Sequence, residues 1–173
     1  MQAKAQGPDA YRRALSQFAT GITVVTTRAS SGEPAGITVN SFNSVSLDPP
    51  LVLWSLALRA SAFDAFRYCK RYMVNVLAAD QLELAKCFAA SGKDRFATAR
   101  WTPTDSGMPR LNGCVAWFEC ANRSQYEEGD HVILVGRVES FEIAHGTPLI
   151  FHDGRYVTEL AEAPLPRTLR RRS

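Results

Sequence analysis

Two long runs of alternating apolar and polar residues constrain the fold of this chain more than any other feature. They are residues 114–126 (CVAWFECANRSQY) and 131–143 (HVILVGRVESFEI). Alternation with a period of two places successive side chains on opposite faces of a β-strand. Only the residues EEGD separate the two runs, which is the length of a short hairpin connection. The pattern therefore predicts a long antiparallel hairpin.

Shorter segments extend this hairpin to a larger sheet. Further strands are expected at residues 22–27, 51–56 and 72–77, with a short pair at 149–157. Residues 22–46 read as a hairpin around the turn SSGEP, and Asp48-Pro49-Pro50 should interrupt pairing because proline has no backbone N–H. Mostly sequential antiparallel neighbours and few helices indicate a mainly β protein, an antiparallel barrel with peripheral helices.

Three helices are expected around this barrel, at residues 9–19, after Ser61 and at residues 80–89. Ser61 would be the N-cap of the second helix, with Phe63 and Phe66 facing the core. In the third, Asp80 and Glu83 form a capping pair. Helices at these places would cover the barrel rather than build it.

The length of 173 residues suits one domain. We assign residues 10–160 to that domain, residues 1–9 to an N-terminal tail and residues 161–173 to an arginine-rich C-terminal tail. The formal charge of +3 is more than accounted for by four arginines of the C-terminal tail, so the folded part is near neutral. A tail that binds nucleic acid is the alternative, but a nucleic-acid footprint would spread over a face of the domain, so no nucleic-acid partner is expected.

Composition also bears on the compartment. No apolar run is long enough to span a membrane, and the first ten residues lack the apolar core of a signal peptide, so a cytoplasmic protein without a membrane partner is expected. The four cysteines form no CxxC pair, and no histidine stands at metal-ligand spacing from them. Reduced thiols are therefore expected, and no metal site.

Residues 36–50 (GITVNSFNSVSLDPP) carry an unusual polar face. Read as one strand, the segment places Thr38, Asn40, Ser44 and Ser46 on the same side. These side chains are short and uncharged, and they offer donors and acceptors close to the backbone. Such a face suits a ligand lying flat against the strand. The alternative is an exposed polar strand of any antiparallel barrel.

Three other places offer candidate ligand contacts. Arg59 and Ser61 precede a helix, where free N–H groups favour a phosphate, although simple capping is the alternative. In the polar loop SGKDRF, Lys93 and Arg95 stand beside Phe96, which is expected to be exposed; on its own this segment would be a surface loop. His131 begins a strong strand, where its side chain can overhang the mouth of a barrel, but a lone histidine is more often structural.

The standard catalytic signatures are missing. The chain contains no GxGxxG, GxxxxGK, GxSxG or HExxH, so a Rossmann domain, a P-loop, an α/β-hydrolase and a zincin each lack their motif.

Several of the segments above occur together, and in the same order, in a known family. They are residues 21–27 (GITVVTT), 36–42 (GITVNSF), 45–46 (VS), 48–50 (DPP), 129–131 (GDH) and 154–156 (GRY). Together they resemble the flavin reductase family, more narrowly the NAD(P)H:flavin oxidoreductase components of two-component monooxygenases. The resemblance covers about residues 10–160. It implies an FMN-binding split β-barrel, antiparallel and of Greek-key type.

The resemblance also implies roles for individual residues. Residues that would line the isoalloxazine are Thr38, Val39, Asn40 and Ser41. Residues that would approach the ribityl chain, the phosphate and part of the ring are Ser44, Val45, Ser46, Arg59, Ser61, Lys93 and Phe96. His131 would approach the nicotinamide, and Tyr156 lies in a segment that would close over the stacked rings. No side chain is expected to act as a dedicated catalytic acid or base, since the cofactors carry the hydride chemistry.

The cofactors implied are FMN or FAD together with NADH or NADPH. The resemblance further implies a homodimer that delivers diffusible reduced flavin to a partner monooxygenase. Two alternatives keep the same fold: a flavin- or haem-binding barrel without reductase activity, and a reductase of a corrinoid or a metal chelate.

Overall fold

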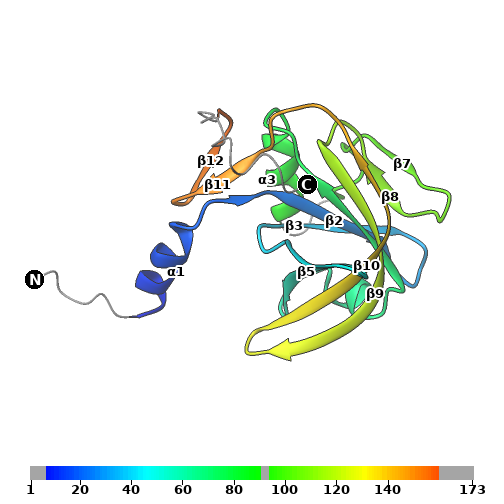
Figure 1. The fold of residues 1–173 in the computed structure, drawn as a ribbon, viewed down its shortest axis with the longest axis horizontal. Coiled ribbons are helices and arrows are strands. Elements are labelled where there is room, and N and C mark those ends of the chain that lie inside the picture. Colours follow the sequence, from blue (N-terminus) through cyan, green and yellow to red (C-terminus); the bar gives the residue numbers. More distant parts are fainter. Residues whose placement is uncertain (1–6, 91–93, 160–173) are drawn as a thin grey trace, which may run out of the picture.

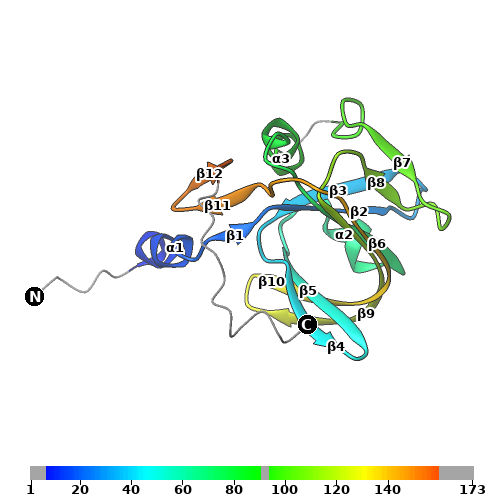
Figure 2. The same cartoon turned by 45° about the horizontal axis from the view of Figure 1, so that its top comes forward.

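The computed structural model describes residues 7–90 and 94–159 of the chain. Its main sheet contains, in spatial order, β3 (Pro34–Val39), β2 (Thr23–Arg28), β6 (Arg71–Val76), β9 (Ala116–Glu128), β10 (His131–Ile143), β5 (Pro50–Ala57) and β4 (Asn43–Leu47). All neighbouring strands are antiparallel. Figures 1 and 2 show this sheet curling round into an open barrel whose two edges are β3 and β4. The expected mainly β, split-barrel fold is confirmed.

The predicted long hairpin is confirmed as β9 and β10, the longest strands in Figure 1. Their connection is a two-residue turn, Gly129-Asp130, in which Gly129 has φ +62°. Glycine with positive φ at the first position is typical of a type II′ turn, whose twist matches that of the flanking strands. Beyond the turn, β10 pairs with β9 on one side and with β5 on the other.

The segment 36–46 is not one strand, which corrects the sequence interpretation. β3 ends at Val39 and pairs with β2, whereas β4 begins at Asn43 and pairs with β5 at the other edge of the sheet. Residues 40–42 carry the chain between the two edges. Periodicity could not reveal this change, because the alternation continues across the break while the pairing partner changes.

The hydroxyl of Ser41 connects this crossing to β5. The backbone N–H of Ser55 donates to Ser41 Oγ at 2.9 Å, and Ser41 Oγ donates to the Ser55 carbonyl at 3.2 Å. One side chain thus replaces the backbone pairing that the crossing segment lacks. After β4, Asp48-Pro49 forms the turn where pairing was expected to stop, but Pro50 already belongs to β5.

The helices are α1 (Pro8–Ser16), α2 (Phe63–Arg67) and α3 (Leu82–Ala89). Each was expected, but the predicted caps are wrong. Ser61 lies two residues before α2, because the chain first turns with the Phe63 N–H bonded to the Ala60 carbonyl at 2.9 Å. The N-cap position of α3 is Gln81, and its Oε1 accepts from the Ala78 N–H at 3.0 Å instead of capping the helix. α1 ends earlier than the expected Ala19 and projects from the barrel in both views (Figures 1 and 2).

Two apolar clusters form the core. Inside the barrel, the Trp54 ring meets Phe66 of α2 and Tyr72 of β6 edge-on, with ring centroids 5.0 and 5.7 Å apart. Beneath α3, Phe96 packs edge-on against Phe88 and Trp101, at 5.1 and 5.7 Å. Phe96 was expected to be exposed; it is half-buried, because α3 and a small hairpin provide apolar neighbours that lie elsewhere in the sequence.

Two small sheets complete the fold. β1 (Thr20–Gly21), β11 (Ile150–His152) and β12 (Arg155–Val157) form one, which includes the predicted strand pair at 149–157. β7 (Trp101–Pro103) and β8 (Pro109–Leu111) form the other. The sequence interpretation treated this second hairpin as loop, since strands of three residues with two prolines show no alternation.

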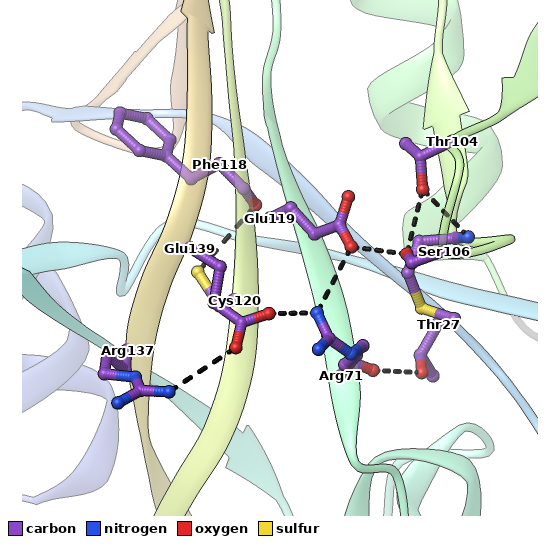
Figure 3. A network of polar contacts seen from close by, with 10 residues as sticks. Thr27, Arg71, Thr104, Ser106, Phe118, Glu119, Cys120, Arg137 and Glu139 are labelled. Carbon is purple, nitrogen blue, oxygen red and sulfur yellow. Dashed lines mark hydrogen bonds and ion pairs between the residues drawn. The ribbon is translucent and has the colours of Figure 1, made fainter.

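A polar network ties the β7–β8 hairpin to the outer face of the main sheet (Figure 3). Ser106 donates to the buried carboxylate of Glu119, whose Oε1 lies 3.6 Å from Arg71 Nη1. Arg71 also pairs with Glu139, which lies 3.6 Å from Arg137. All of these groups except Arg137 border a cavity of about 470 Å³. Because the charged groups pair with one another, we interpret the network as a structural connection between β6, β9, β10 and the hairpin.

Candidate functional site

The end of β3 borders two hollows at the split in the barrel. The first has a volume of about 210 Å³ and is lined by residues 37–41, by residues 55–57 of β5 and by His131. Five predicted site residues therefore meet here: Thr38, Val39, Asn40, Ser41 and His131. The pairing of His131 with Ala57 brings the start of β10 to this place, because the register of β10 on β5 begins at that pair.

The second hollow borders the same strand end and also has a volume of about 210 Å³. Thr38, Val39 and Asn40 line it together with Ile22, Ala89, Phe151 and Tyr156. The Tyr156 ring packs edge-on against Phe151, with centroids 5.5 Å apart. Residues 38–40 thus form a shared floor of both hollows, of which His131 lines the first and Tyr156 the second.

Hydrogen bonds fix one end of this floor and leave the other open. Thr38 Oγ1 donates to the Ala85 carbonyl at 2.7 Å, which anchors β3 to α3. Asn40 is exposed, and its amide forms no side-chain hydrogen bond with the described parts of the chain. An amide offers an acceptor and two donors. The floor therefore presents the amide of Asn40, which is available to a ligand, next to the backbone that leaves the sheet.

His131 is held by the residue before it. Its Nδ1 lies 2.6 Å from Asp130 Oδ1, and the imidazole is half-exposed. The hydrogen bond and the charge of His131 lower the pKa of the Asp130 carboxyl, and the positive charge of Arg59 adds to this. Asp130 therefore stays ionised at neutral pH, and Arg59 contributes to the electrostatics of this corner.

Arg95 links the loop after α3 to the floor. Its Nε donates to the Ala90 carbonyl at 3.0 Å, Nη1 donates to the Gly36 carbonyl of β3, and Nη2 donates to Ser61 Oγ at 3.0 Å. Because Ser61 accepts from Arg95, its own hydroxyl proton is available to another acceptor. Arg95 thereby fixes Ser61 relative to β3, a role that neighbouring positions in the sequence could not indicate.

Other predicted residues lie away from the hollows. Ser44, Val45 and Ser46 belong to β4 at the opposite edge of the sheet and line neither hollow. Phe96 points into the apolar cluster beneath α3. Lys93 lies outside the described residues. The sequence interpretation in turn missed Ser55, Leu56 and Ala57, whose apolar strand pattern gave no sign that β5 borders a hollow.

The chemistry of the arrangement favours binding over side-chain catalysis. The floor offers backbone groups and the amide of Asn40, and the imidazole of His131 lines the first hollow beside it. Over residues 7–90 and 94–159, no group of three or more His, Cys, Asp or Glu side chains could hold a metal ion. Within the same ranges, no helix is both long enough and apolar enough to cross a bilayer.

Comparisons with known proteins identify relatives of this chain. An FMN reductase (NADH) of Agrobacterium fabrum is 44% identical over 146 residues, which are 84% of this chain and 83% of the relative. The reductase component of a flavin-dependent trigonelline monooxygenase of Acinetobacter baylyi is 41% identical over 147 residues, which are 85% of this chain and 47% of the relative.

A solved structure adds the three-dimensional comparison. The NADH:FAD oxidoreductase of Streptomyces globisporus, in complex with NAD and FAD fragments, superposes with a TM-score of 0.87 at 36% identity, covering 94% of this chain and 100% of that one. Some curated relatives are longer, and this chain spans about half of their length, 51% of one and 47% of another. A family model described as a flavin reductase like domain matches residues 15–159. The chain therefore belongs to the flavin reductase-like domain family.

Proposed function

We propose that this chain is an NAD(P)H-dependent flavin reductase, which transfers hydride from reduced nicotinamide to FMN or FAD. The observation that supports this best is the shared floor, where residues 38–40 border both the hollow lined by His131 and the hollow lined by Tyr156. Hydride transfer requires the two rings to stack face to face, and a surface shared by both hollows can hold one ring on the other. Relatives that are named as NADH-dependent reductases of FMN and of FAD support the same reading.

The residues of the floor fit a flavin. Its isoalloxazine is flat, with a polar pyrimidine edge that needs donors and acceptors. Asn40 and the backbone that leaves the sheet at residues 40–42 offer both. For the phosphate, the free hydroxyl proton of Ser61, fixed by Arg95, offers a donor at an exposed position. We assign Thr38, Val39, Asn40 and Ser41 to the ring, and Arg59 and Ser61 to the phosphate end.

The protein's part in the reaction is binding and orientation. When bound, the nicotinamide and the flavin supply the hydride donor and acceptor. The side chains then need to align the two rings and keep water away, which can supply much of the rate enhancement of such a step. His131 orients the nicotinamide, and Tyr156 covers the second hollow. No side chain needs to transfer a proton during the hydride step.

The proposal includes a homodimer in the cytoplasm. Large apolar side chains remain exposed on β4, namely Val45 and Leu47, and near the end of β10, namely Phe141 and Ile143. Exposed apolar side chains of this size favour a protein interface. Four free thiols suit a reducing compartment. We also propose that the flavin reductase domain extends from residue 10 to residue 160.

Reduced flavin would then serve a monooxygenase. One relative is named as the reductase component of such a system. By analogy with that relative, we propose that reduced flavin leaves the site and is used by a separate partner protein.

NADH oxidation by the purified chain tests this proposal. The assay is run with FMN, FAD, riboflavin or no flavin, and is repeated with NADPH. Turnover that requires added flavin is the expected result, and the rates rank the flavins and the two nucleotides. Tight flavin binding without turnover would instead identify a non-catalytic flavin-binding barrel or a reductase of another acceptor, such as a corrinoid or a metal chelate.

A further inference from the structure

The backbone around Asp130 is fixed on both sides. Asp130 is the second residue of the β9–β10 turn, after Gly129 with its φ of +62°. Its carbonyl accepts from the Leu58 N–H at 3.0 Å, which ties the turn to the end of β5. The backbone position of Asp130 next to the start of β10 is therefore determined by the fold.

This carboxylate determines which nitrogen of His131 carries the proton. Asp130 Oδ1 and His131 Nδ1 are 2.6 Å apart. An ionised carboxylate only accepts hydrogen bonds, so Nδ1 must be the donor. When the imidazole is neutral its proton then resides on Nδ1, and Nε2 keeps its lone pair. The lowered pKa of Asp130 supports this, because the carboxyl stays ionised wherever the imidazole is neutral.

The free nitrogen of His131 is the one available to a ligand in the first hollow. His131 lines the first hollow with residues 37–41, whereas Asp130 does not line it and its side chain is 88% exposed. Since Nδ1 is engaged with Asp130, Nε2 is the ring nitrogen left for a ligand. A free imidazole in water prefers the opposite tautomer, with the proton on Nε2, so the acceptor state depends on Asp130.

We propose that Asp130 is a positioning residue, which keeps His131 Nε2 as an acceptor for the carboxamide N–H of a reduced nicotinamide. This inference rests on the proposed function, because it deepens the role of His131 in the same site. It commits to a chemical class: a planar ring that carries a primary amide is favoured over the same ring with a ketone. Specificity then depends on a residue that does not touch the ligand.

Nitrogen NMR of histidine-labelled protein tests the tautomer without any activity. The spectrum is recorded above the pH at which the imidazole becomes neutral, and His131→Ala assigns the signal. The wild type is expected to carry the proton on Nδ1, and Asp130→Ala is expected to move it to Nε2. A wild type that already carries it on Nε2, or an Asp130→Ala variant that keeps it on Nδ1, would overturn the inference.

Kinetics with a ketone analogue test the consequence. Reduced 3-acetylpyridine adenine dinucleotide keeps the carbonyl of NADH and lacks the amide N–H. Asp130→Ala is expected to lower kcat/KM for NADH about 5- to 10-fold, mainly through KM, which corresponds to one hydrogen bond at an accessible site. For the ketone analogue, the same variant should change kcat/KM by less than about twofold, since that ring offers no N–H to Nε2.

Glu128→Gln is the matched control, because it removes one exposed negative charge from the same hairpin end. It should affect neither nucleotide. An equal fall for both nucleotides in Asp130→Ala would show a general effect of charge or folding and overturn the inference. If the wild type oxidises no NADH with any flavin, the proposed function and the carboxamide contact both fail, while the NMR result decides the tautomer by itself.

Discussion

The hydroxyl of Ser41 accepts the backbone N–H of Ser55 at 2.9 Å and lies 3.2 Å from the Ser55 carbonyl. This contact joins the segment that crosses the split in the barrel to β5, directly beside the first hollow. The segment that follows the binding floor is therefore held against β5 by one side chain rather than by regular sheet pairing. The stability of the barrel and the shape of the site should consequently respond to the same substitution.

Ser41→Ala should lower the free energy of unfolding by about 1 to 2 kcal/mol, because it leaves the Ser55 N–H and carbonyl without a partner. Urea denaturation measures the change. Ser44→Ala is the matched control, since Ser44 is exposed and its hydroxyl forms no hydrogen bond within the described residues. Equal stability of the two variants would show that the Ser41 contact does not hold the crossing.

Gly36→Ala should destabilise the chain by about 1 to 3 kcal/mol through overpacking. A Cβ at Gly36 would lie 2.7 Å from Cε1 of Phe88, which is buried and packs against Phe96. Gly21→Ala is the control, because a Cβ there meets nothing within 4 Å. A thermal melt that shows no difference between the two variants would mean that α3 moves freely away from β3.

Arg95→Lys should weaken FMN binding about tenfold and leave riboflavin binding within about twofold. Lysine keeps the charge but cannot bridge three acceptors, so Ser61 and the loop at residues 94–96 lose their connection to β3. Of the two flavins, only FMN carries a phosphate, so only FMN binding depends on this connection. Fluorescence titration gives both affinities, with Arg100→Lys as the exposed control. Equal weakening of the two flavins would place Arg95 at the ring instead.

His131→Ala and Asn40→Ala should affect different ligands. The first is expected to raise KM for NADH more than it weakens flavin binding, because His131 lies on one side of the floor. The second should weaken flavin binding by about 1 kcal/mol, the value for one exposed hydrogen bond. His145→Ala, an exposed residue away from both hollows, is the control. Parallel losses in both variants would contradict separate places for the two rings.

Alkaline pH should destabilise the chain through two buried thiols. Burial raises the pKa of Cys114 and of Cys120 to about 12, from an ordinary value of 9.0. In the unfolded chain these thiols lose their protons near the ordinary value, while the folded chain retains them. Their contribution to stability is therefore complete below about pH 9 and falls as the pH rises toward 12, by at most about 1.4 kcal/mol per pH unit for each thiol.

Urea denaturation at about pH 8 and about pH 10 measures this loss, with Cys114→Ala/Cys120→Ala as the comparison. The double variant should be less stable at the lower pH, because it leaves cavities, but should lose less stability between the two. An identical loss in both proteins would rule out these thiols as the cause.

Elements with a strong local pattern could be predicted from the sequence. β9 and β10 alternate over more than ten residues each, and the glycine of their turn specifies the connection. The segments of β2, β5 and β6 are rich in β-branched or apolar residues, and all three are strands of the main sheet, as expected. In these cases the local preference and the final packing agree, so no distant contact was needed to find them.

Features that depend on distant partners could not be predicted. Ser61 has the pattern of an N-cap, but the turn before α2 displaces it, and its hydroxyl bonds to Arg95 across 34 positions. Phe96 stands in a polar loop, yet Phe88 and Trp101 bury its ring. Only the fold brings these residues together, and a linear pattern does not contain that information.

In the candidate site, too, some residues could be predicted from the sequence and others could not. Thr38, Asn40 and His131 were found from their own chemistry and from the family resemblance, and they meet at one hollow. Ser44 and Ser46 share the alternation of Thr38, but the chain changes its pairing partner between them. Between these residues the chain crosses from one edge of the sheet to the other. This crossing separates side chains that a strict alternation had predicted to lie on one face.

Anaerobic mixing of NADH with the chain and FMN tests the proposed reaction most directly. Loss of the oxidised-flavin absorbance reports hydride transfer itself, without any contribution from oxygen or from a partner protein. We expect FMN to be reduced much faster with the chain than without it, with one NADH consumed for each flavin. FMN that binds to the chain and stays oxidised in the presence of NADH would contradict a flavin reductase.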